Sequence, residues 1–320
     1  MSIVTIGQDD MAIIDIKHLS HTYKGGFKAL DDINLSFDAG VFGLLGPNGA
    51  GKSTLMRILC TLLEPTEGQV SVCGHDVMES PMAVRSQLGY LPQEFGAWRS
   101  HRVEEVLDTL AQLSGMLDKP SRHQTVSEVL EAVGLGDVAD RKVKKLSGGM
   151  LRRLGIAQAL IHGPKVIIVD EPTVGLDPEE RIRFRNVLTN LGRDRTILLS
   201  THIVADLGGA CKAVALLDNG QIIFQGSPAE LVQGAIGHVF QLSVSETELD
   251  DLEAKYDLVS TSIGSGSLVV RGISHEDELP PNAEVVQEPS LEESYMAFMA
   301  ARGRSGSARQ DEEHADTEVA

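Results

Sequence analysis

A glycine-rich segment with a single lysine offers the clearest chemistry in this sequence. Residues 46–54 read Gly46-Pro47-Asn48-Gly49-Ala50-Gly51-Lys52-Ser53-Thr54, between an apolar run at 41–45 and a helical pattern at 55–63. Backbone N–H groups of such a loop converge on phosphate oxygens at the positive end of the following helix. Lys52 would add a charge beside the β- and γ-phosphates, and Ser53 would ligate magnesium. A plain strand-to-helix turn is the alternative, and the match at every motif position makes it the weaker interpretation.

A second apolar run, Val166–Val169, ends in two adjacent acids. Asp170 is placed to hold the magnesium shell, and Glu171 to polarise an attacking water. Buried strands often end in an acid at a sheet edge, so this pattern alone favours neither chemistry nor a structural role. Together with the phosphate-binding loop, it predicts a nucleotide and magnesium site.

These residues need elements that bring strand ends together. Three short apolar segments, 41–45, 166–169 and 197–199, predict buried parallel strands followed by functional loops. Ahead of them, alternating apolar positions across 11–38 predict antiparallel strands around a Gly25–Gly26 turn. A helical insert is predicted between the first two parallel strands. Its helices cover Val103–Leu113, Thr125–Val133 with a Thr125/Glu128 capping box, and Met150–Ile161.

The segment Leu146-Ser147-Gly148-Gly149-Met150 precedes the acidic strand and resembles the signature sequence of the ABC ATPase family. Other motifs of that family are present before and after this segment, in the family's order, across residues 23–202. They are the aromatic Tyr23, Gln93 in Tyr-Leu-Pro-Gln, Asp177 in Gly-Leu-Asp and His202 in Ser-Thr-His. Singly, a surface aromatic, a loop polar residue or a strand-end histidine would explain Tyr23, Gln93 or His202 equally well. So many elements in the family's order make a joint accident negligible.

The resemblance implies an α/β fold of the P-loop NTPase, ABC ATPase type, with a mixed sheet core, an antiparallel N-terminal β-subdomain and a helical insert. It implies ATP and magnesium as cofactors. The implied catalytic residues are Glu171, His202, Lys52 and Gln93, and the implied magnesium ligands are Ser53, Gln93 and Asp170. The implied nucleotide-binding residues are Tyr23, which would stack on adenine, and Gly46, Pro47, Asn48, Gly49, Ala50, Gly51, Lys52, Ser53 and Thr54. Gln93 would also sense the membrane subunit, and His202 would contact the γ-phosphate.

The chain has two donor-rich helix starts but one phosphate-loop lysine. The second start, Ser147–Gly149, lacks a nucleotide of its own. In the resembled family this signature, with Asp177 of the D-loop, completes the partner's nucleotide site, which implies a homodimer with two-fold symmetry. Met150 replaces the usual glutamine, but Ser147 and both glycines remain. We therefore expect the chain to be active.

The subtype resembles the ATPases of drug-resistance and multidrug-type exporters, through Gly89-Tyr-Leu-Pro-Gln-Glu-Phe and the helix opening Ser290-Leu-Glu-Glu-Ser. The resemblance implies export, a separate transmembrane permease, and a peripheral place on the inner face of the cell membrane. Phe95, Trp98 and the helix Val103–Leu113 lie where that family docks its membrane subunit. For Trp98, the core of the helical insert is the alternative to this interface.

Other functions are weighed against this one. An importer ATPase shares the core motifs. A soluble ABC ATPase acting on DNA or ribosomes is disfavoured, because Ser147 follows Lys52 by only 95 residues, which leaves no room for a long coiled coil. A purely regulatory subunit predicts damage to Lys52, Glu171 or the signature, and all are intact.

Composition sets the outer limits. The 320 residues, 42% hydrophobic and 23% charged, suit a globular protein with a sizeable core. No apolar run is long enough for a spanning helix, and residues 1–10 lack the features of a secretory signal, so a cytoplasmic location is expected. The net charge of −18, without a basic stripe, argues against nucleic acid. The three cysteines, an odd number, predict buried free thiols at Cys60, Cys73 and Cys211.

Charge also divides the chain, because residues 244–320 hold 18 acidic and 5 basic residues. We predict an N-terminal extension at 1–10, with Met11 as an alternative start, and a nucleotide-binding domain at 11–237 whose helical subdomain spans about 94–160. A small α+β domain is predicted at 238–300 and a disordered acidic tail at 301–320. Around this boundary the sequence predicts a hairpin at Asp218–Gly220, helices opening at Ser227, Ser245 and Ser290, and strands at His238–Val244, Leu268–Val270 and Glu284–Val286.

Overall fold

The computed structural model describes residues 13–207, 211–263, 267–274 and 279–303. The chain divides into two compact units, Met1–Gln225 and Gly226–Ala320. The predicted extension 1–10, the alternative start Met11 and the predicted tail beyond residue 303 lie outside the described residues. Within the described ranges, no helix is both long enough and apolar enough to span a membrane.

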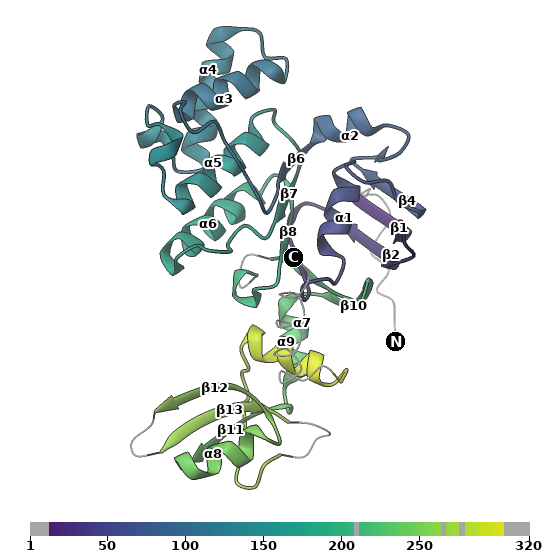
Figure 1. Cartoon of the computed structure of the whole chain (residues 1–320), viewed down its shortest axis with the longest axis vertical. Coiled ribbons are helices and arrows are strands. Elements are labelled where there is room, and N and C mark those ends of the chain that lie inside the picture. Colours follow the sequence, from purple (N-terminus) through teal and green to yellow (C-terminus); the bar gives the residue numbers. More distant parts are fainter. Residues whose placement is uncertain (1–12, 208–210, 264–266, 275–278, 304–320) are drawn as a thin grey trace. The chain divides into compact units, whose positions relative to one another are not determined.

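The first unit begins with the predicted antiparallel strands (Figure 1). Ile14 pairs with Phe37, and the turn between these strands contains Gly25 and Gly26, whose φ angles of 116° and 89° suit glycine. A return strand pairs with the other edge of the first strand. The sheet has the order β2-β1-β4-β5, with β1 at Ile14–Thr22, β2 at Lys28–Phe37, β4 at Glu67–Val72 and β5 at His75–Asp76.

A six-stranded sheet forms the centre of this unit, in the order β10-β9-β3-β8-β7-β6. Its strands are β3 (Gly40–Leu45), β6 (Leu88–Leu91), β7 (Val166–Asp170), β8 (Thr196–Thr201), β9 (Ala213–Asp218) and β10 (Gln221–Gly226). The three predicted parallel strands are β3, β8 and β7, which lie side by side and are almost wholly buried. Burial on both faces explains their continuous apolar composition.

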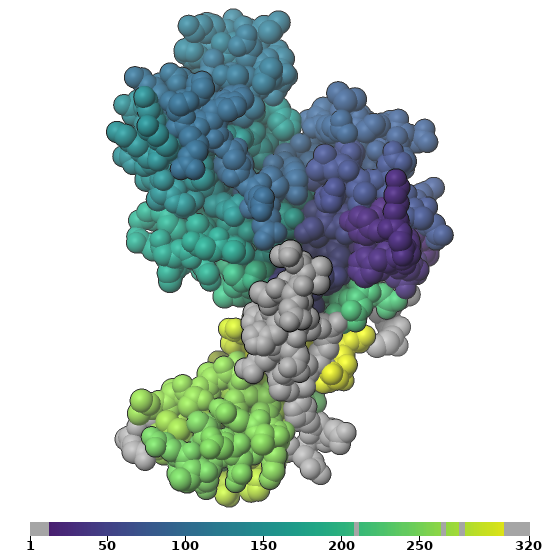
Figure 2. Space-filling view, viewed as in Figure 1, coloured from purple at the N-terminus to yellow at the C-terminus, as the bar shows by residue number. Residues whose placement is uncertain are grey.

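The helices of this unit pack against its sheets or form the helical insert. They are α1 (Lys52–Leu59), α2 (Pro81–Gln87), α3 (Val103–Leu113), α4 (Lys119–Ala132), α5 (Gly148–Leu160) and α6 (Pro178–Leu191). Helix α1 packs against β2, β4 and β7, so it lies between the two sheets. Helices α3, α4 and α5 pack together as the predicted helical insert, blue to teal in Figures 1 and 2. All three cysteines are free, as predicted, with Cys60 buried and the other two half-buried.

Two predicted helix starts were wrong. Helix α4 begins at Lys119, because Asp118 accepts a hydrogen bond of 3.0 Å from the Ser121 N–H and caps the helix. Thr125 lies inside that helix, where its hydroxyl donates to the Ser121 carbonyl at 3.0 Å. Helix α5 begins at Gly148 rather than Met150, since Ser147 is its N-cap.

The second unit is an α+β domain with the sheet order β12-β13-β11-β14. Its elements are α7 (Pro228–Ala235), β11 (Val239–Val244), α8 (Glu246–Glu253), β12 (Asp257–Ile263), β13 (Leu268–Ile273), β14 (Glu284–Val285) and α9 (Leu291–Ala300). The predicted capping boxes open α7, α8 and α9. The unit starts at Gly226, earlier than the predicted residue 238, because α7 packs against α9.

Candidate nucleotide site

The predicted phosphate-binding loop connects β3 to α1, and close packing explains its glycines. A Cβ added at Gly46 would lie 2.2 Å from the Leu217 carbonyl oxygen, and one at Gly51 would lie 2.5 Å from the Ala29 carbonyl oxygen. Gly49 and Gly51 also have φ angles of 76° and 107°, in the left-handed region that favours glycine. Other residues would therefore displace the loop from β9 and β2.

A cavity of about 500 Å³ lies over this loop and gathers residues from four distant segments. The predicted Gln93, Glu171 and His202 line it together with the loop itself. The complete lining is Phe27, Ala29, Asn48, Gly49, Ala50, Gly51, Lys52, Ser53, Thr54, Gln93, Glu171, Val174 and His202.

Three predicted catalytic side chains form one polar network at this cavity. Lys52 Nζ lies 3.4 Å from Glu171 Oε1, and both side chains are 6% exposed. His202 Nδ1 lies 2.8 Å from Glu171 Oε2. Lys52 also donates to the carbonyl oxygens of Gly46 and Pro47, at 2.7 and 3.1 Å. Burial lowers the pKa of Lys52, and the negative charge of Glu171 partly offsets that effect.

The two acids at the end of β7 take different directions. Asp170 is 3% exposed, does not line the cavity, and accepts a hydrogen bond of 2.5 Å from the Ser200 hydroxyl. Glu171 lies at the cavity wall with a φ of 45°, a conformation that costs a non-glycine residue about 1–3 kcal/mol. The surrounding fold therefore holds Glu171 in a strained backbone position that faces the cavity.

The donor set fits a nucleotide with magnesium. Ser53, Gln93 and Glu171 bring oxygen atoms to the same cavity, and oxygen atoms are the ligands that magnesium prefers. Asp170 does not line the cavity and accepts from Ser200, so it fits the outer shell better than direct ligation. When bound, the cation would neutralise negative charge on the phosphates.

The aromatic residues of the site differ from expectation. Tyr23 is not among the lining residues; its hydroxyl shares a hydrogen bond of 3.1 Å with Thr54 Oγ1, and its ring meets His21 edge to face at 4.7 Å. Phe27, 64% exposed, lines the cavity instead. Sequence reasoning missed Phe27, although an aromatic residue directly after the Gly25–Gly26 turn was a usable signal.

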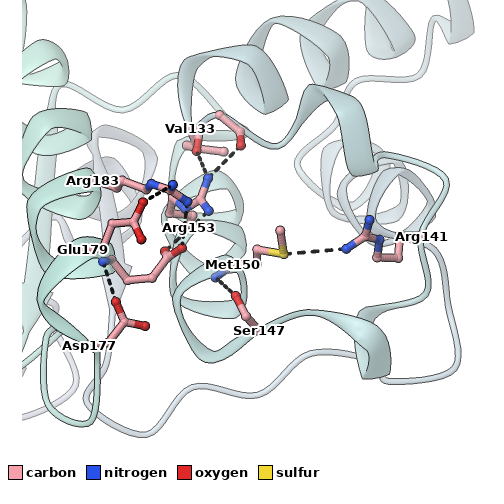
Figure 3. A network of polar contacts seen from close by, with 10 residues as sticks. Val133, Arg141, Ser147, Met150, Arg153, Asp177, Glu179 and Arg183 are labelled. Carbon is pink, nitrogen blue, oxygen red and sulfur yellow. Dashed lines mark hydrogen bonds and ion pairs between the residues drawn. The ribbon is translucent and has the colours of Figure 1, made fainter.

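The signature and D-loop residues lie elsewhere. Ser147 accepts a hydrogen bond of 3.1 Å from the Met150 N–H at the start of α5 (Figure 3). Asp177 caps α6 by accepting from the Glu180 N–H at 2.9 Å. Gly148 lines a second cavity of about 620 Å³, together with Gln93 and Gly175. None of these residues except Gln93 lines the cavity over the phosphate-binding loop.

Comparison with known proteins decides the family. The family model described as "ABC transporter" matches residues 30–174. The Nod factor export ATP-binding protein I of Burkholderia orbicola is 35% identical over 229 residues, which cover 71% of this chain and 75% of that protein. This chain belongs to the ABC transporter ATP-binding proteins. The daunorubicin/doxorubicin resistance ATP-binding protein DrrA of Streptomyces peucetius is 36% identical over 225 residues, covering 70% of this chain and 68% of that protein.

A longer relative covers more of this ABC protein. The probable multidrug ABC transporter ATP-binding protein YbhF of Escherichia coli is 33% identical over 310 residues, or 92% of this chain. The match spans 54% of YbhF, so the chain corresponds to about half the length of that relative.

Solved structures confirm the predicted ABC ATPase fold. CbiO1 of Clostridium perfringens, described as part of the ABC transporter complex cbiONQ, has a TM-score of 0.66 at 26% identity, covering 77% of this chain and 96% of that one. The ATP-binding cassette MJ0796, a dimer bound to ADP and Pi, has a TM-score of 0.60 at 25% identity, covering 67% of this chain and 98% of that one.

Proposed function

We propose that this chain binds ATP with magnesium, hydrolyses it, and drives a separate transmembrane permease. The contact of Glu171 with both Lys52 and His202 at the wall of the phosphate-loop cavity carries the proposal. A buried carboxylate held between a lysine and a histidine, beside a phosphate-binding loop, is a positioned general base.

In this reaction each side chain has a distinct task. Lys52 exchanges its contact with Glu171 for the β- and γ-phosphates, which leaves Glu171 Oε1 able to accept a proton from the attacking water. His202 holds Glu171 Oε2 through Nδ1, and its other ring nitrogen would contact the γ-phosphate. Ser53 and Gln93 would hold the cation, and Asp170, which does not line the cavity, would act in its outer shell.

A second copy would complete the site. Ser147, Gly148, Gly149 and Asp177 lie outside the phosphate-loop cavity of their own chain, so they are free to cap the nucleotide of a partner. We infer a homodimer in which each signature faces the partner's phosphate-binding loop. The dimeric form of the similar cassette MJ0796 supports this arrangement.

The permease interface and the direction of transport are also proposals. Trp98 is 46% exposed and lines a groove of about 370 Å³ with Val106 and Leu110, which favours an interface over a core position. Docking there would place the chain peripherally on the inner face of the membrane. The word "export" in the name of one relative, and drug resistance in that of another, support export over import.

Replacement of Glu171 by Gln tests the proposed chemistry. The amide keeps the side chain's size but cannot accept the proton, so we expect ATP turnover to fall by about 10²-fold or more while ATP binding persists. Turnover and nucleotide affinity would be measured together on purified protein. Glu179→Gln is the matched control, because Glu179 is 75% exposed on α6 and should leave turnover unchanged. Equal turnover in the Glu171 variant and the wild type would remove Glu171 from the reaction.

A further inference from the structure

Two basic segments of the first unit lie side by side. The Val103 N–H donates to the Arg141 carbonyl, the Val143 N–H to the His101 carbonyl, and the Lys144 N–H to the Arg99 carbonyl, each at 3.0 Å. Arg102 and Lys142 form an antiparallel bridge between the same segments. We call this surface the cationic ribbon. It consists of Arg99, His101, Arg102, Arg141, Lys142, Lys144 and Lys145.

The residues of the cationic ribbon are all exposed. Among the described residues, the ion pairs include only one of its members, Arg102, at 3.8 Å from Glu104. Arg141 reaches the Met150 sulfur at 3.9 Å, as Figure 3 shows. The acids that adjoin the ribbon in sequence are Asp140, Glu104 and Glu105. Six lysines and arginines therefore exceed the adjoining acids by three.

This surface corrects the expectation that the chain has no basic stripe. About forty residues of sequence separate the two segments, and the second is short. Their charges merge only because backbone hydrogen bonds place 99–102 against 141–145. In a chain of net charge −18, such a concentration of one sign creates a local field opposite to that of the whole molecule.

We propose that the cationic ribbon binds the anionic phospholipid headgroups of a membrane surface. Trp98, directly before the ribbon, is 46% exposed, and its ring centroid lies 5.9 Å from that of His101. Because Trp98 also lines the groove proposed for the permease, the ribbon adjoins a surface that would lie next to the membrane. A tryptophan beside lysines and arginines is the composition of surfaces that sit at the headgroup level.

Two other occupants fit less well. Cytoplasmic loops of membrane proteins carry an excess of lysine and arginine, which a basic ribbon would repel. A nucleic acid needs several successive phosphate contacts, and a long polyanion would extend from this short ribbon over an acidic molecule. Separate lipid headgroups meet neither obstacle.

Co-sedimentation of the full chain with vesicles tests this proposal without ATP, so its outcome is independent of the proposed hydrolysis. We expect binding to phosphatidylcholine vesicles that contain phosphatidylglycerol and none to phosphatidylcholine alone. Raising the salt from about 0.1 M to about 1 M should release the protein, because the screening length falls from about 10 Å to about 3 Å. Equal binding to both vesicles, or binding that resists salt, would overturn the proposal.

A matched pair of variants locates the surface. The triple substitution Arg99→Gln, Lys142→Gln and Lys144→Gln should weaken vesicle binding about a hundredfold, since each basic residue near an anionic surface contributes about 1 kcal/mol. The control removes three exposed charges elsewhere, through Lys17→Gln, Lys119→Gln and Arg193→Gln, and should bind nearly as the wild type does. Equal losses in both variants would assign the binding to net charge, and tighter binding to duplex RNA than to anionic vesicles would assign the ribbon to nucleic acid.

Discussion

At the scale of single residues, the site depends on which aromatic ring meets the base. Tyr23 is held by Thr54 and His21, while the exposed Phe27 faces the cavity. We predict that Phe27→Ala weakens ATP binding by about 1–3 kcal/mol, the usual contribution of stacking between an aromatic residue and a base. Tyr23→Phe keeps the ring and should cost less than about 1 kcal/mol.

Titration calorimetry with ATP and with a triphosphate that lacks the base separates these contributions. The Phe27 substitution should matter for ATP and not for the bare triphosphate. If Tyr23→Ala costs more than Phe27→Ala, Tyr23 must leave Thr54 when nucleotide binds, and the family resemblance would be the better guide.

The candidate catalytic residues were predictable from sequence to the extent that they belong to recognisable motifs. Lys52, Glu171 and His202 stand in motifs whose order identifies them, and the structure brings all three to one cavity. The contacts of Glu171 with Lys52 and His202 were not predictable, because they depend on the positive φ of Glu171 and on the register of β7 with β8. Phe27 was missed because no motif includes it.

At the scale of elements, hydrophobic periodicity predicted the buried strands correctly, whereas capping patterns in the sequence placed some helix starts wrongly. Thr125 and Glu128 have the spacing of a capping box and predicted a helix start at Thr125. The helix instead begins after Asp118, its N-cap, with Pro120 in its first turn. Strand β12 was not predicted, since its sequence Asp-Leu-Val-Ser-Thr-Ser-Ile carries polar residues on an edge strand that is largely exposed. Edge strands need little burial, so hydrophobic pattern is a weak signal for them.

Helices α4, α5 and α6 meet at Arg153, which is 6% exposed. Its guanidinium donates to the Val133 and Gly134 carbonyl oxygens at 3.3 and 2.7 Å, and lies 3.5 Å from Glu180 Oε2 (Figure 3). We predict that Arg153→Met destabilises the first unit by about 3 kcal/mol, because it removes the donor to the buried Val133 carbonyl and to the Gly134 carbonyl, and one of the two arginine partners of the half-buried Glu180.

Urea unfolding would measure this effect, with Arg183→Met as its control. Arg183 pairs with the same Glu180 at 3.2 Å but is 54% exposed, so its loss should cost less than about 1 kcal/mol. Comparable losses of unfolding free energy in the two variants would show that charge balance around Glu180, rather than the buried contacts of Arg153 between three helices, determines stability.

At the scale of the whole molecule, each unit has a core of its own. The first surrounds α1 between the two sheets, and the second lies under α7 and α9. We predict two transitions when the full chain is heated in a calorimeter, since domains with separate cores unfold as separate units. ATP with magnesium should raise the midpoint temperature of only the first transition. At a ligand concentration of a hundred times the dissociation constant, it should stabilise the first unit by about 2.7 kcal/mol.

The second transition should respond to Glu293 instead. Burial raises the pKa of this carboxyl, but hydrogen bonds from Ser290 and the charge of Arg271 outweigh that effect and lower it below 4.5. A lowered pKa means that the ionised form stabilises the folded unit above pH 4.5, and that this stabilisation is lost as the pH falls through the folded value. Glu293→Gln should lower the free energy of unfolding of the second unit by about 1–2 kcal/mol at neutral pH. The stability of this variant should then fall less steeply as the pH is lowered. The neighbouring Glu292→Gln is exposed and should change neither transition. A single transition that moves as a whole with nucleotide and with Glu293 would refute the division into two units.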